Sequence, residues 1–220
     1  MQCIVTAGPT FEPLDEVRRL TNLSTGRLGS ELVNYLAARG HEATLLIGQQ
    51  ATYRGERHAR QTDTFTTTAN LRERLQALAS PAVTAVFHAA AVSDFTFGKV
   101  WRRSPQGELI EIKGGKISTR AGTLLAELLP TPKIITELRQ WFPAARLVGW
   151  KYEVEGGRAG VIRLAERQIT ECRTDACVAN GPAYGTGFGL VKAGGAVTHL
   201  PDAASLFPAL EEFMREPHEA

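Results

Sequence analysis

Apolar runs and amphipathic stretches alternate along the first half of the chain. The first run, residues 2–7, is rich in strand-forming residues and stops at Gly8-Pro9-Thr10, which is typical of a buried strand followed by a turn. Between residues 26 and 39 the apolar positions recur at helical spacing, and Gly40 ends the pattern. Further strands are predicted over 42–47, 60–65 and 82–90, with a helix over 69–79. This alternation predicts a parallel sheet with helices on both faces.

The second half continues the alternation after one irregular stretch. Residues 91–116 are rich in turn formers and charges, so we expect a functional loop there, above all over 98–116, with room for a short strand within 108–113. Beyond it the pattern predicts strands over 124–129, 146–150 and 175–180, helices over 132–142, 160–172 and 205–215, and a hairpin over 190–200. Pro132 should start the first of these helices, and Ser205 should cap the last.

The expected fold is therefore a Rossmann-like three-layer α/β fold with a mostly parallel sheet and a C-terminal β-hairpin extension. It should form a single domain over residues 1–220.

Composition narrows the class of protein. The chain has 25 Lys and Arg against 23 Asp and Glu, for a net charge of +2, and 43% of its residues are hydrophobic. These values predict a globular chain and exclude disordered, collagen-like and coiled-coil classes. We expect a cytoplasmic protein that is not a membrane protein, because no apolar run approaches the ~18 residues of a span and no leader pattern opens the chain. We also expect no nucleic-acid partner, because no basic run with interleaved aromatics occurs.

The cysteines suggest no metal site or disulfide framework. Cys3, Cys172 and Cys177 are odd in number and lack metal-ligand spacing with any histidine. We expect them to be buried free thiols.

Ligands of an open parallel sheet bind beyond the carboxyl ends of its strands, so the residues there are the candidates for chemistry. After the first strand an insertion over 10–27 leads into Asn22-Leu23-Ser24-Thr25-Gly26-Arg27-Leu28-Gly29. The N–H groups and positive dipole end of a helix start suit phosphate, and Arg18 and Arg19 lie near in sequence. The same residues are equally consistent with Ser24 or Thr25 as a helix cap, with glycines that allow close packing.

Other strand ends carry further candidates. The small residues Ala89, Ala90 and Ala91 would let a ligand lie against the backbone, and Asp94 could hold a metal, a ribose or a base, or could cap a turn. Lys113 and Lys116 flank two glycines, which could form a mobile cationic lid or a solvated turn. The end of the strand at 146–150 adds an aromatic side chain with mixed charges over 148–153, and the strand at 175–180 ends in Asn180, before Gly181. Each of these is weak evidence alone.

Taken in order, these motifs resemble the phosphopantothenate-cysteine ligase family over nearly the whole chain. Residues 5–18 look like that family's opening, residues 21–29 like its Asn-x-Ser-Ser/Thr-Gly loop, and residues 90–95 like its Ala-Ala-Val-x-Asp-aromatic segment. Lys116-Ile117, Pro132 before a helix, Val148-Gly149-Trp150 and residues 175–180 complete the order.

The resemblance implies a ligase of coenzyme A biosynthesis. In that family 4'-phosphopantothenate is activated by CTP or ATP to an acyl-nucleotide with release of pyrophosphate, and L-cysteine then displaces the nucleotide. The resemblance also implies Mg²⁺ and a homodimer. The catalytic residues would be Asn22, Arg18 and Lys116. The nucleotide would be bound by Gly8, Ser24, Thr25, Gly26, Ala91, Asp94, Lys116 and Trp150, and the substrate by Asn22, Arg18 and Ala90.

The chain departs from the family pattern at several positions. Ser118 and Thr119 follow Lys116-Ile117 where bacterial members have two lysines, which leaves ATP and CTP open as the nucleotide. Other departures are Pro9 in the opening turn, Gly181 after Asn180, and Gln168 and Cys172 near the family's helix lysines, with Arg167 and Arg173 beside them. We expect a stand-alone synthetase domain without the decarboxylase half, and therefore no flavin.

Two other functions stay open at this point. A nicotinamide-dependent reductase or epimerase of the short-chain type would explain Thr25-Gly26-Arg27-Leu28-Gly29, but its loop should follow the first strand directly with three spaced glycines. None of the tyrosines has a lysine four residues on, as that class requires. A non-catalytic nucleotide-binding protein on the same fold is the second alternative, because fold does not fix function.

Overall fold

An eight-stranded sheet forms the centre of the protein in a computed structural model, which describes residues 1–112, 115–118 and 122–216. The strands lie in the order β13-β12-β11-β10-β6-β1-β4-β5. All neighbours from β11 to β5 pair in parallel, whereas β12 and β13 form an antiparallel hairpin on β11. The strands are β1 (Gln2–Ala7), β4 (Glu42–Gly48), β5 (Gln61–Phe65), β6 (Val83–His88), β10 (Arg146–Tyr152), β11 (Ala176–Asn180), β12 (Phe188–Lys192) and β13 (Val197–Leu200).

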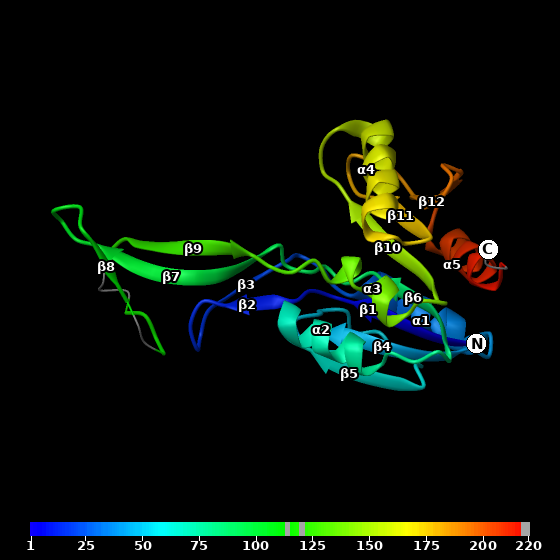
Figure 1. Ribbon diagram of the computed structural model, residues 1–220, viewed down its shortest axis with the longest axis horizontal. Coiled ribbons are helices and arrows are strands. Elements are labelled where there is room, and N and C mark those ends of the chain that lie inside the picture. Colours follow the sequence, from blue (N-terminus) through cyan, green and yellow to red (C-terminus); the bar gives the residue numbers. More distant parts are fainter. Residues whose placement is uncertain (113–114, 119–121, 217–220) are drawn as a thin grey trace.

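Helices cover both faces of this sheet (Figure 1). The strand period of two sends alternate side chains to opposite faces, so Val5 packs toward α1 (Arg27–Ala38) and α5 (Ala203–Arg215), whereas Ile4 packs toward the other side. That other side is covered by α2 (Thr68–Ala77), η2 (Ile134–Thr136), α3 (Leu138–Trp141) and α4 (Gly157–Cys172). The sheet with these helices is called the body below. The expected three-layer fold and its C-terminal hairpin are confirmed.

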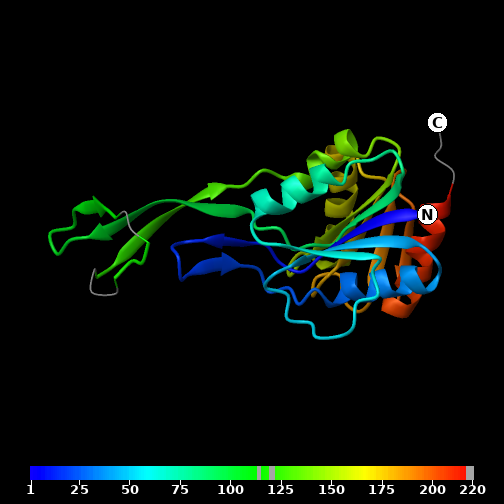
Figure 2. The ribbon, with the colours of Figure 1, turned by 90° about the horizontal axis from the view of Figure 1, so that it is seen from below.

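Two ribbons project from the body beyond the carboxyl ends of its strands (Figures 1 and 2). The arm is a three-stranded antiparallel sheet of β7 (Phe95–Arg103), β8 (Leu109–Glu111) and β9 (Leu124–Pro130). The hairpin is β2 (Phe11–Pro13) paired with β3 (Arg19–Thr21), inside the insertion that precedes α1. The ribbons give the molecule an elongated shape.

The tip of the hairpin is bonded to the far part of the arm. The backbone N–H of Glu16 donates to the carbonyl of Gly115 (2.9 Å), and Arg18 donates to the carbonyl of Ile117 (2.5 Å). Asp15 accepts from the N–H of Ile117 (3.1 Å). These contacts, called the latch below, bind the residues on either side of Lys116.

The predicted loop over 98–116 is wrong. β7 runs through Gly98 to Arg103 and pairs with β8 and β9 instead of burying one face in the core. β8 itself lies within 108–113, where a short strand was expected. Without a buried face, the strands lack the regular apolar alternation that would have marked them. Lys113, Gly114 and Thr119 lie outside the described residues.

Two smaller predictions about helices are also wrong. The segment after Pro132 stays extended at Lys133, and the expected helix is divided into a 3-10 turn and the four-residue α3. The guanidinium of Arg139 donates to the carbonyls of Phe142 and Ala145, so it satisfies groups at the end of α3. The last helix is capped by Asp202, which accepts from the N–H of Ser205 at 2.8 Å, and not by Ser205 itself.

Candidate functional site

The carboxyl ends of β1 and β6 stay side by side beyond the sheet. The N–H of Ala91 donates to the carbonyl of Gly8 (3.0 Å), and the N–H of Thr10 donates to the carbonyl of Ala91 (3.1 Å). The side-chain amide of Asn22 donates to the carbonyls of Ala91 (3.3 Å) and Val92 (3.1 Å). The structure thus brings together Asn22, Gly8 and Ala91, which sequence reasoning assigned to one site.

The loop before α1 packs closely on the end of β1. Gly8 and Gly26 both have φ of 76°, a conformation that favours glycine. A Cβ on Gly26 would lie 2.8 Å from Cδ1 of Ile47 and 3.3 Å from Cα of Gly8, so no side chain fits between the loop and the strand. Gly26 occupies the cap position of α1 without a side-chain bond, and the Thr25 hydroxyl accepts from the N–H of Arg27 (3.2 Å). Ser24 or Thr25 as the cap residue of α1 is therefore wrong.

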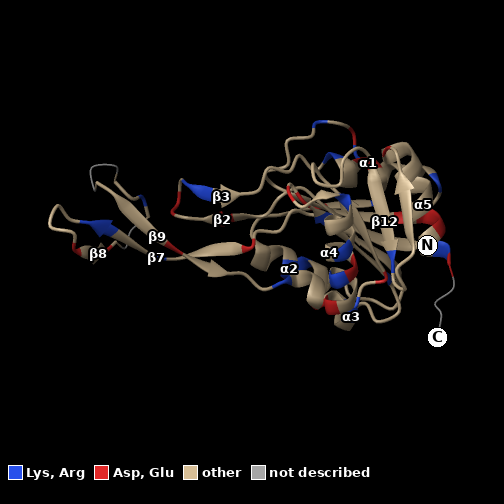
Figure 3. Ribbon diagram, turned by 90° about the horizontal axis from the view of Figure 1, so that it is seen from above, with Lys and Arg blue, Asp and Glu red and all other residues tan. Residues whose placement is uncertain are grey.

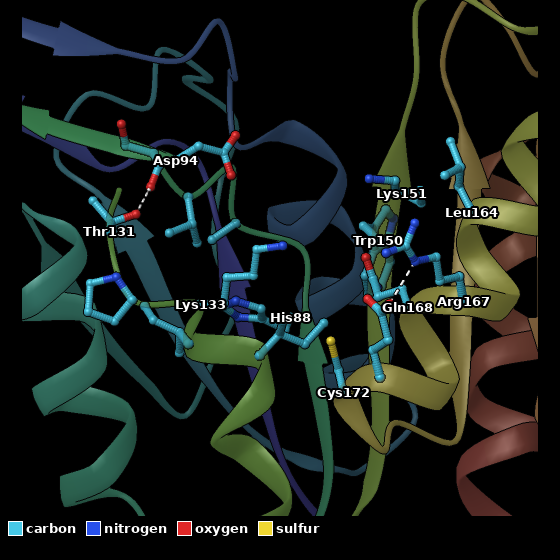
Figure 4. A pocket seen from close by; sticks show the side chains of 17 residues that line it. His88, Asp94, Thr131, Lys133, Trp150, Lys151, Leu164, Arg167, Gln168 and Cys172 are labelled. Carbon is cyan, nitrogen blue, oxygen red and sulfur yellow. Dashed lines mark hydrogen bonds and ion pairs between the residues drawn. The ribbon is translucent and has the colours of Figure 1, made fainter. Parts of the chain in front are cut away.

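A cavity of about 410 Å³ opens between the ends of β6 and β10, η2 and α4 (Figure 4). It contains Ala90, Asp94 and Trp150 from the predicted set. Its other lining residues are His88, Val92, Ser93, Thr131, Pro132, Lys133, Ile134, Ile135, Lys151, Leu164, Arg167, Gln168, Glu171 and Cys172.

The lining of the cavity carries more positive than negative groups. The charged residues in the lining are three cationic ones, Lys133, Lys151 and Arg167, and two acidic ones, Asp94 and Glu171. Arg167 lies 2.6 Å from Glu171, whose hydrogen bond from Arg167 lowers the pKa of that carboxyl, and Lys151 lies 3.0 Å from Glu153. Lys133 has no ion pair within the described ranges, and its amino group reaches into the cavity in Figure 4. A ligand with negative charge suits this lining.

Two buried polar atoms near the ends of β10 and β11 have no hydrogen-bond partner among the described residues. They are Nε1 of Trp150, a donor, and Oδ1 of Asn180, an acceptor. Buried polar groups are rarely left unpaired, so both atoms are available to a ligand or to water.

Arg18 and Lys116 lie elsewhere. Arg18 forms an ion pair with Asp15 at 2.6 Å within the latch, and Lys116 lies between two residues that the latch holds. The bonds from Arg18, followed by those from the N–H groups of Ile117, Val17 and Arg18, hold the pKa of Asp15 well below its usual range although burial opposes this. The structure brings Arg18 and the segment around Lys116 together in the latch, and neither residue lines the cavity. The hairpin and the arm that carry them project from the body in Figure 2.

Sequence reasoning missed several residues of the cavity. His88, Thr131, Lys133 and Lys151 received no role, although each lies at or just after the end of a strand. That position is the one signal that could have identified them. Arg167, noted as a substitute for the family's helix lysines, lines the cavity, whereas Arg173 does not.

The family of the chain is defined by comparison with known proteins. The family described as DNA/pantothenate metabolism flavoprotein C-terminal domain matches residues 1–205, and the chain belongs to this family.

Two of the named relatives are proteins of coenzyme A biosynthesis. The coenzyme A biosynthesis bifunctional protein CoaBC of Thermococcus kodakarensis is 32% identical over 181 residues, which cover 80% of this chain and 40% of that protein. The Bacillus subtilis protein of the same name is 29% identical over 187 residues, covering 84% of this chain and 42% of that protein. The chain thus spans about 40% of the length of these relatives.

Solved structures share the fold. The DNA/pantothenate metabolism flavoprotein of Streptococcus pneumoniae superposes with a TM-score of 0.84 at 24% identity over 98% of both chains. A Cab2 variant in complex with phosphopantothenate-cysteine superposes with a TM-score of 0.69 at 18% identity, covering 97% of this chain and 84% of that one.

Proposed function

We propose that the protein is a phosphopantothenate-cysteine ligase, which joins 4'-phosphopantothenate to L-cysteine in coenzyme A biosynthesis. Support comes from the family match and from the named relatives. The single observation that carries it is the position of Asn22, whose amide is tied to Ala91 and Val92 between the α1 loop and the cavity. A residue there can contact a group that bridges a phosphate at the loop and a nucleoside in the cavity.

The proposed reaction has two steps. The carboxylate of phosphopantothenate attacks the α-phosphorus of a nucleoside triphosphate, and the bond to pyrophosphate breaks. The amine of cysteine then attacks the acyl carbon, the bond to the nucleoside monophosphate breaks, and the amine loses a proton. Both steps move negative charge onto phosphate oxygens, so backbone N–H groups at α1 and the lysines of the site stabilise the transition states.

The nucleotide would lie with its triphosphate toward Ser24, Thr25 and Gly26 and its nucleoside in the cavity near Asp94 and Trp150. Both ATP and CTP fit this proposal. Mg²⁺ would arrive with the phosphates, since it usually takes only one or two protein carboxylates and keeps its other oxygens from water and phosphate. Asp94 is the lining carboxylate without an ion pair in the part of the chain that the structure describes, and no three His, Cys, Asp or Glu side chains there cluster around a metal position.

We further propose a homodimer in which the arm and hairpin of one subunit reach the cavity of the other. The two ribbons expose apolar side chains to solvent, namely Val17, Leu20, Phe95, Leu109, Ile110, Leu128 and Leu129. They also carry cationic residues away from the body, at β3 and around β8 (Figure 3). Lys116 and Arg18 could then act on the substrate bound by the partner, although they are distant from their own cavity.

Mixing inactive subunits tests the dimer. Asn22→Asp and Lys116→Gln should each lose activity, and if the two residues serve one site from different subunits, a mixture should regain about a quarter of wild-type turnover, from the one intact site in each mixed dimer. Light scattering should give twice the mass of the chain. A monomer, or a mixture as inactive as its parts, would contradict the proposal.

The reaction itself is tested by pyrophosphate release. Purified protein with Mg²⁺ and 4'-phosphopantothenate is given ATP or CTP, each with and without L-cysteine. Release that requires phosphopantothenate and one nucleotide supports the ligase and names that nucleotide. Binding of a nucleotide without release would favour the non-catalytic alternative. The nicotinamide-dependent alternative has no support in the comparisons.

Three expectations about location and partners stay predictions: a cytoplasmic protein, without nucleic acid and without flavin. Within the described residues no helix is long and apolar enough to cross a membrane.

A further inference from the structure

His88 lies at the floor of the cavity and has no role in the mechanism above. It is the last residue of β6, only 6% exposed, and its register neighbours are Thr6 in β1 and Gly149 in β10. A buried polar side chain that lines a cavity at the carboxyl end of a sheet is positioned to contact a ligand.

The hydrogen bonds of Thr6 determine which ring nitrogen of His88 carries the proton. Oγ1 of Thr6 accepts the N–H of Ala90 (3.1 Å) and lies 3.0 Å from Nδ1 of His88. No other acceptor for this hydroxyl occurs among the described residues, so it donates its single proton to Nδ1. The ring must then carry its own proton on Nε2, for which the structure gives no partner within its described ranges. Burial lowers the pKa of His88 to about 4, so the ring is a neutral donor at physiological pH.

An acceptor lies beside this donor. A Cβ on Gly149 would lie 2.3 Å from Nε2 of Gln168 and 2.8 Å from Cδ1 of Ile135, so the absence of a side chain at 149 lets the Gln168 amide lie over the floor next to His88. Nε2 of Gln168 donates to Sγ of Cys177 at 3.3 Å, which orients the amide with Oε1 as its free acceptor.

The rest of this part of the cavity suits a planar ring. Ile135 and Leu164 provide apolar walls on η2 and α4, and Figure 4 shows His88 and Gln168 between those two elements. A donor and an acceptor between apolar walls are what a nucleobase edge requires, whereas a phosphate would need only donors.

We propose that His88 is a specificity-determining residue of the nucleotide site, whose Nε2–H donates to a ring nitrogen of the nucleobase while Oε1 of Gln168 accepts from the adjacent exocyclic amine. Adenine presents this pair at N1 and N6, and cytosine presents it at N3 and N4. Guanine and uracil present an N–H and a carbonyl at those positions. Their N–H would face the N–H of His88, and their carbonyl would face Oε1 of Gln168, so neither hydrogen bond would form. The inference rests on the proposed function, since it assigns the base of that nucleotide.

The test distinguishes the contribution of the base to nucleotide binding from that of the phosphates. Dissociation constants are measured for Mg²⁺-ATP, Mg²⁺-CTP, Mg²⁺-GTP, Mg²⁺-UTP and Mg²⁺-tripolyphosphate with the wild type, His88→Leu and His88→Gln. His58→Leu is the matched control, because His58 lies outside the cavity with its side chain 62% exposed. We expect His88→Leu to weaken the preferred amino-base nucleotide about tenfold, the worth of one hydrogen bond to a buried group. Binding of tripolyphosphate should be unchanged, His88→Gln should retain part of the affinity, and His58→Leu should match the wild type.

Thr6→Val is a second variant, in case His88→Leu does not fold. It is nearly isosteric and leaves Nδ1 without its partner, so it should reduce the preference for amino bases over keto bases and leave tripolyphosphate binding unchanged.

Two results would overturn the inference. One is a wild-type dissociation constant for ATP and CTP in a folded His88→Leu, and the other is an equal loss for tripolyphosphate. If the wild type itself binds neither ATP nor CTP, the proposed function fails and the inference fails with it. If the wild type binds one of them and His88→Leu binds it equally well, the inference alone fails.

Discussion

The strands of the body and those of the arm differ in how far their apolar side chains are buried. In the body each strand buries residues such as Val5, Phe87 and Val178 under helices, and side chains fix which face points inward. In the arm, β7 and β9 pair through their backbones while Leu128 and Leu129 stay exposed. The body therefore has a continuous core of its own, whereas most large apolar side chains of the arm are exposed or half-buried and only a few, such as Val100 and Ile117, are buried. A dimer of the kind proposed above would cover the exposed face of the arm.

The largest effect should come from the body's core. Phe87 is fully buried on β6, so Phe87→Ala removes a large side chain and leaves a cavity. We expect a loss of about 3–5 kcal/mol in the free energy of unfolding, measured in urea. The arm variant Leu128→Ala, measured on the separated subunit at low protein concentration, should change that energy by less than about 0.5 kcal/mol, because Leu128 is 49% exposed there. Equal losses in the two variants would contradict the division into body and arm.

Asn22→Asp should affect catalysis while leaving the body stable. A carboxylate at residue 22 has no N–H to donate to the carbonyls of Ala91 and Val92, and it repels negative charge at the reacting groups. We expect turnover to fall roughly 100-fold or more, the order found for loss of a single stabilising group at a reaction centre. Quenched reactions should show acyl-nucleotide accumulating. Unchanged turnover would show that Asn22 is not a catalytic residue.

Glu211→Gln tests the contribution of a buried charge to the stability of the body. The helix that carries Glu211, α5, lies near the amino ends of the sheet strands, far from the arm (Figure 1). Glu211 is buried on α5 and accepts from Tyr35 (2.8 Å), His41 (3.0 Å) and Arg215 (2.7 Å). Burial alone would raise its pKa, but these bonds outweigh it and lower the pKa from 4.5 to about 2. Replacing the charged acceptor should cost about 1–3 kcal/mol at neutral pH.

The pH dependence of that cost has a defined sign. Because the pKa of Glu211 is lowered in the folded protein, its contribution is complete above pH 4.5 and is lost as the pH falls toward 2. The wild type should lose its advantage over Glu211→Gln across this range in urea titrations. A difference between the two proteins that does not vary with pH would show that the charge is not responsible.

The smallest of these effects should come from the latch. Asp15→Asn weakens the bond to Arg18 and removes an acceptor for the N–H of Ile117, so the segment that carries Lys116 is held less firmly. We expect turnover to fall about tenfold, as for loss of a charge-assisted hydrogen bond, with the free energy of unfolding unchanged. Hydrogen exchange at residues 115–118 should become faster. Unaltered exchange would show that Asp15 does not hold this segment.

The sequence predicts which face of a single element is buried, but it misassigned the residues that cap α1 and α5 and is weaker wherever two distant elements act together. The pattern of apolar residues identified β1 and α1, because each buries its own face against the core, and the turn residues Ala193-Gly194-Gly195 identified the β12–β13 hairpin. β9 was predicted as a strand over 124–129, but β7 was missed because that pairing partner lies more than twenty residues away and no regular apolar alternation marks β7 itself. Asn22, Gly8 and Ala91 could be assigned together because their motifs resemble those of the family, and the structure brings the three residues side by side. The orientation of His88 by Thr6 could not, since 82 residues separate them in sequence.

Identification of the reaction products is the decisive experiment for the proposed ligase activity. Protein, Mg²⁺, 4'-phosphopantothenate, L-cysteine and the nucleotide that supports pyrophosphate release are incubated and analysed by mass spectrometry. We predict phosphopantothenoylcysteine and nucleoside monophosphate in equal amounts, both absent with Asn22→Asp or without nucleotide. Folded protein that binds the nucleotide yet forms neither product would contradict the proposed function.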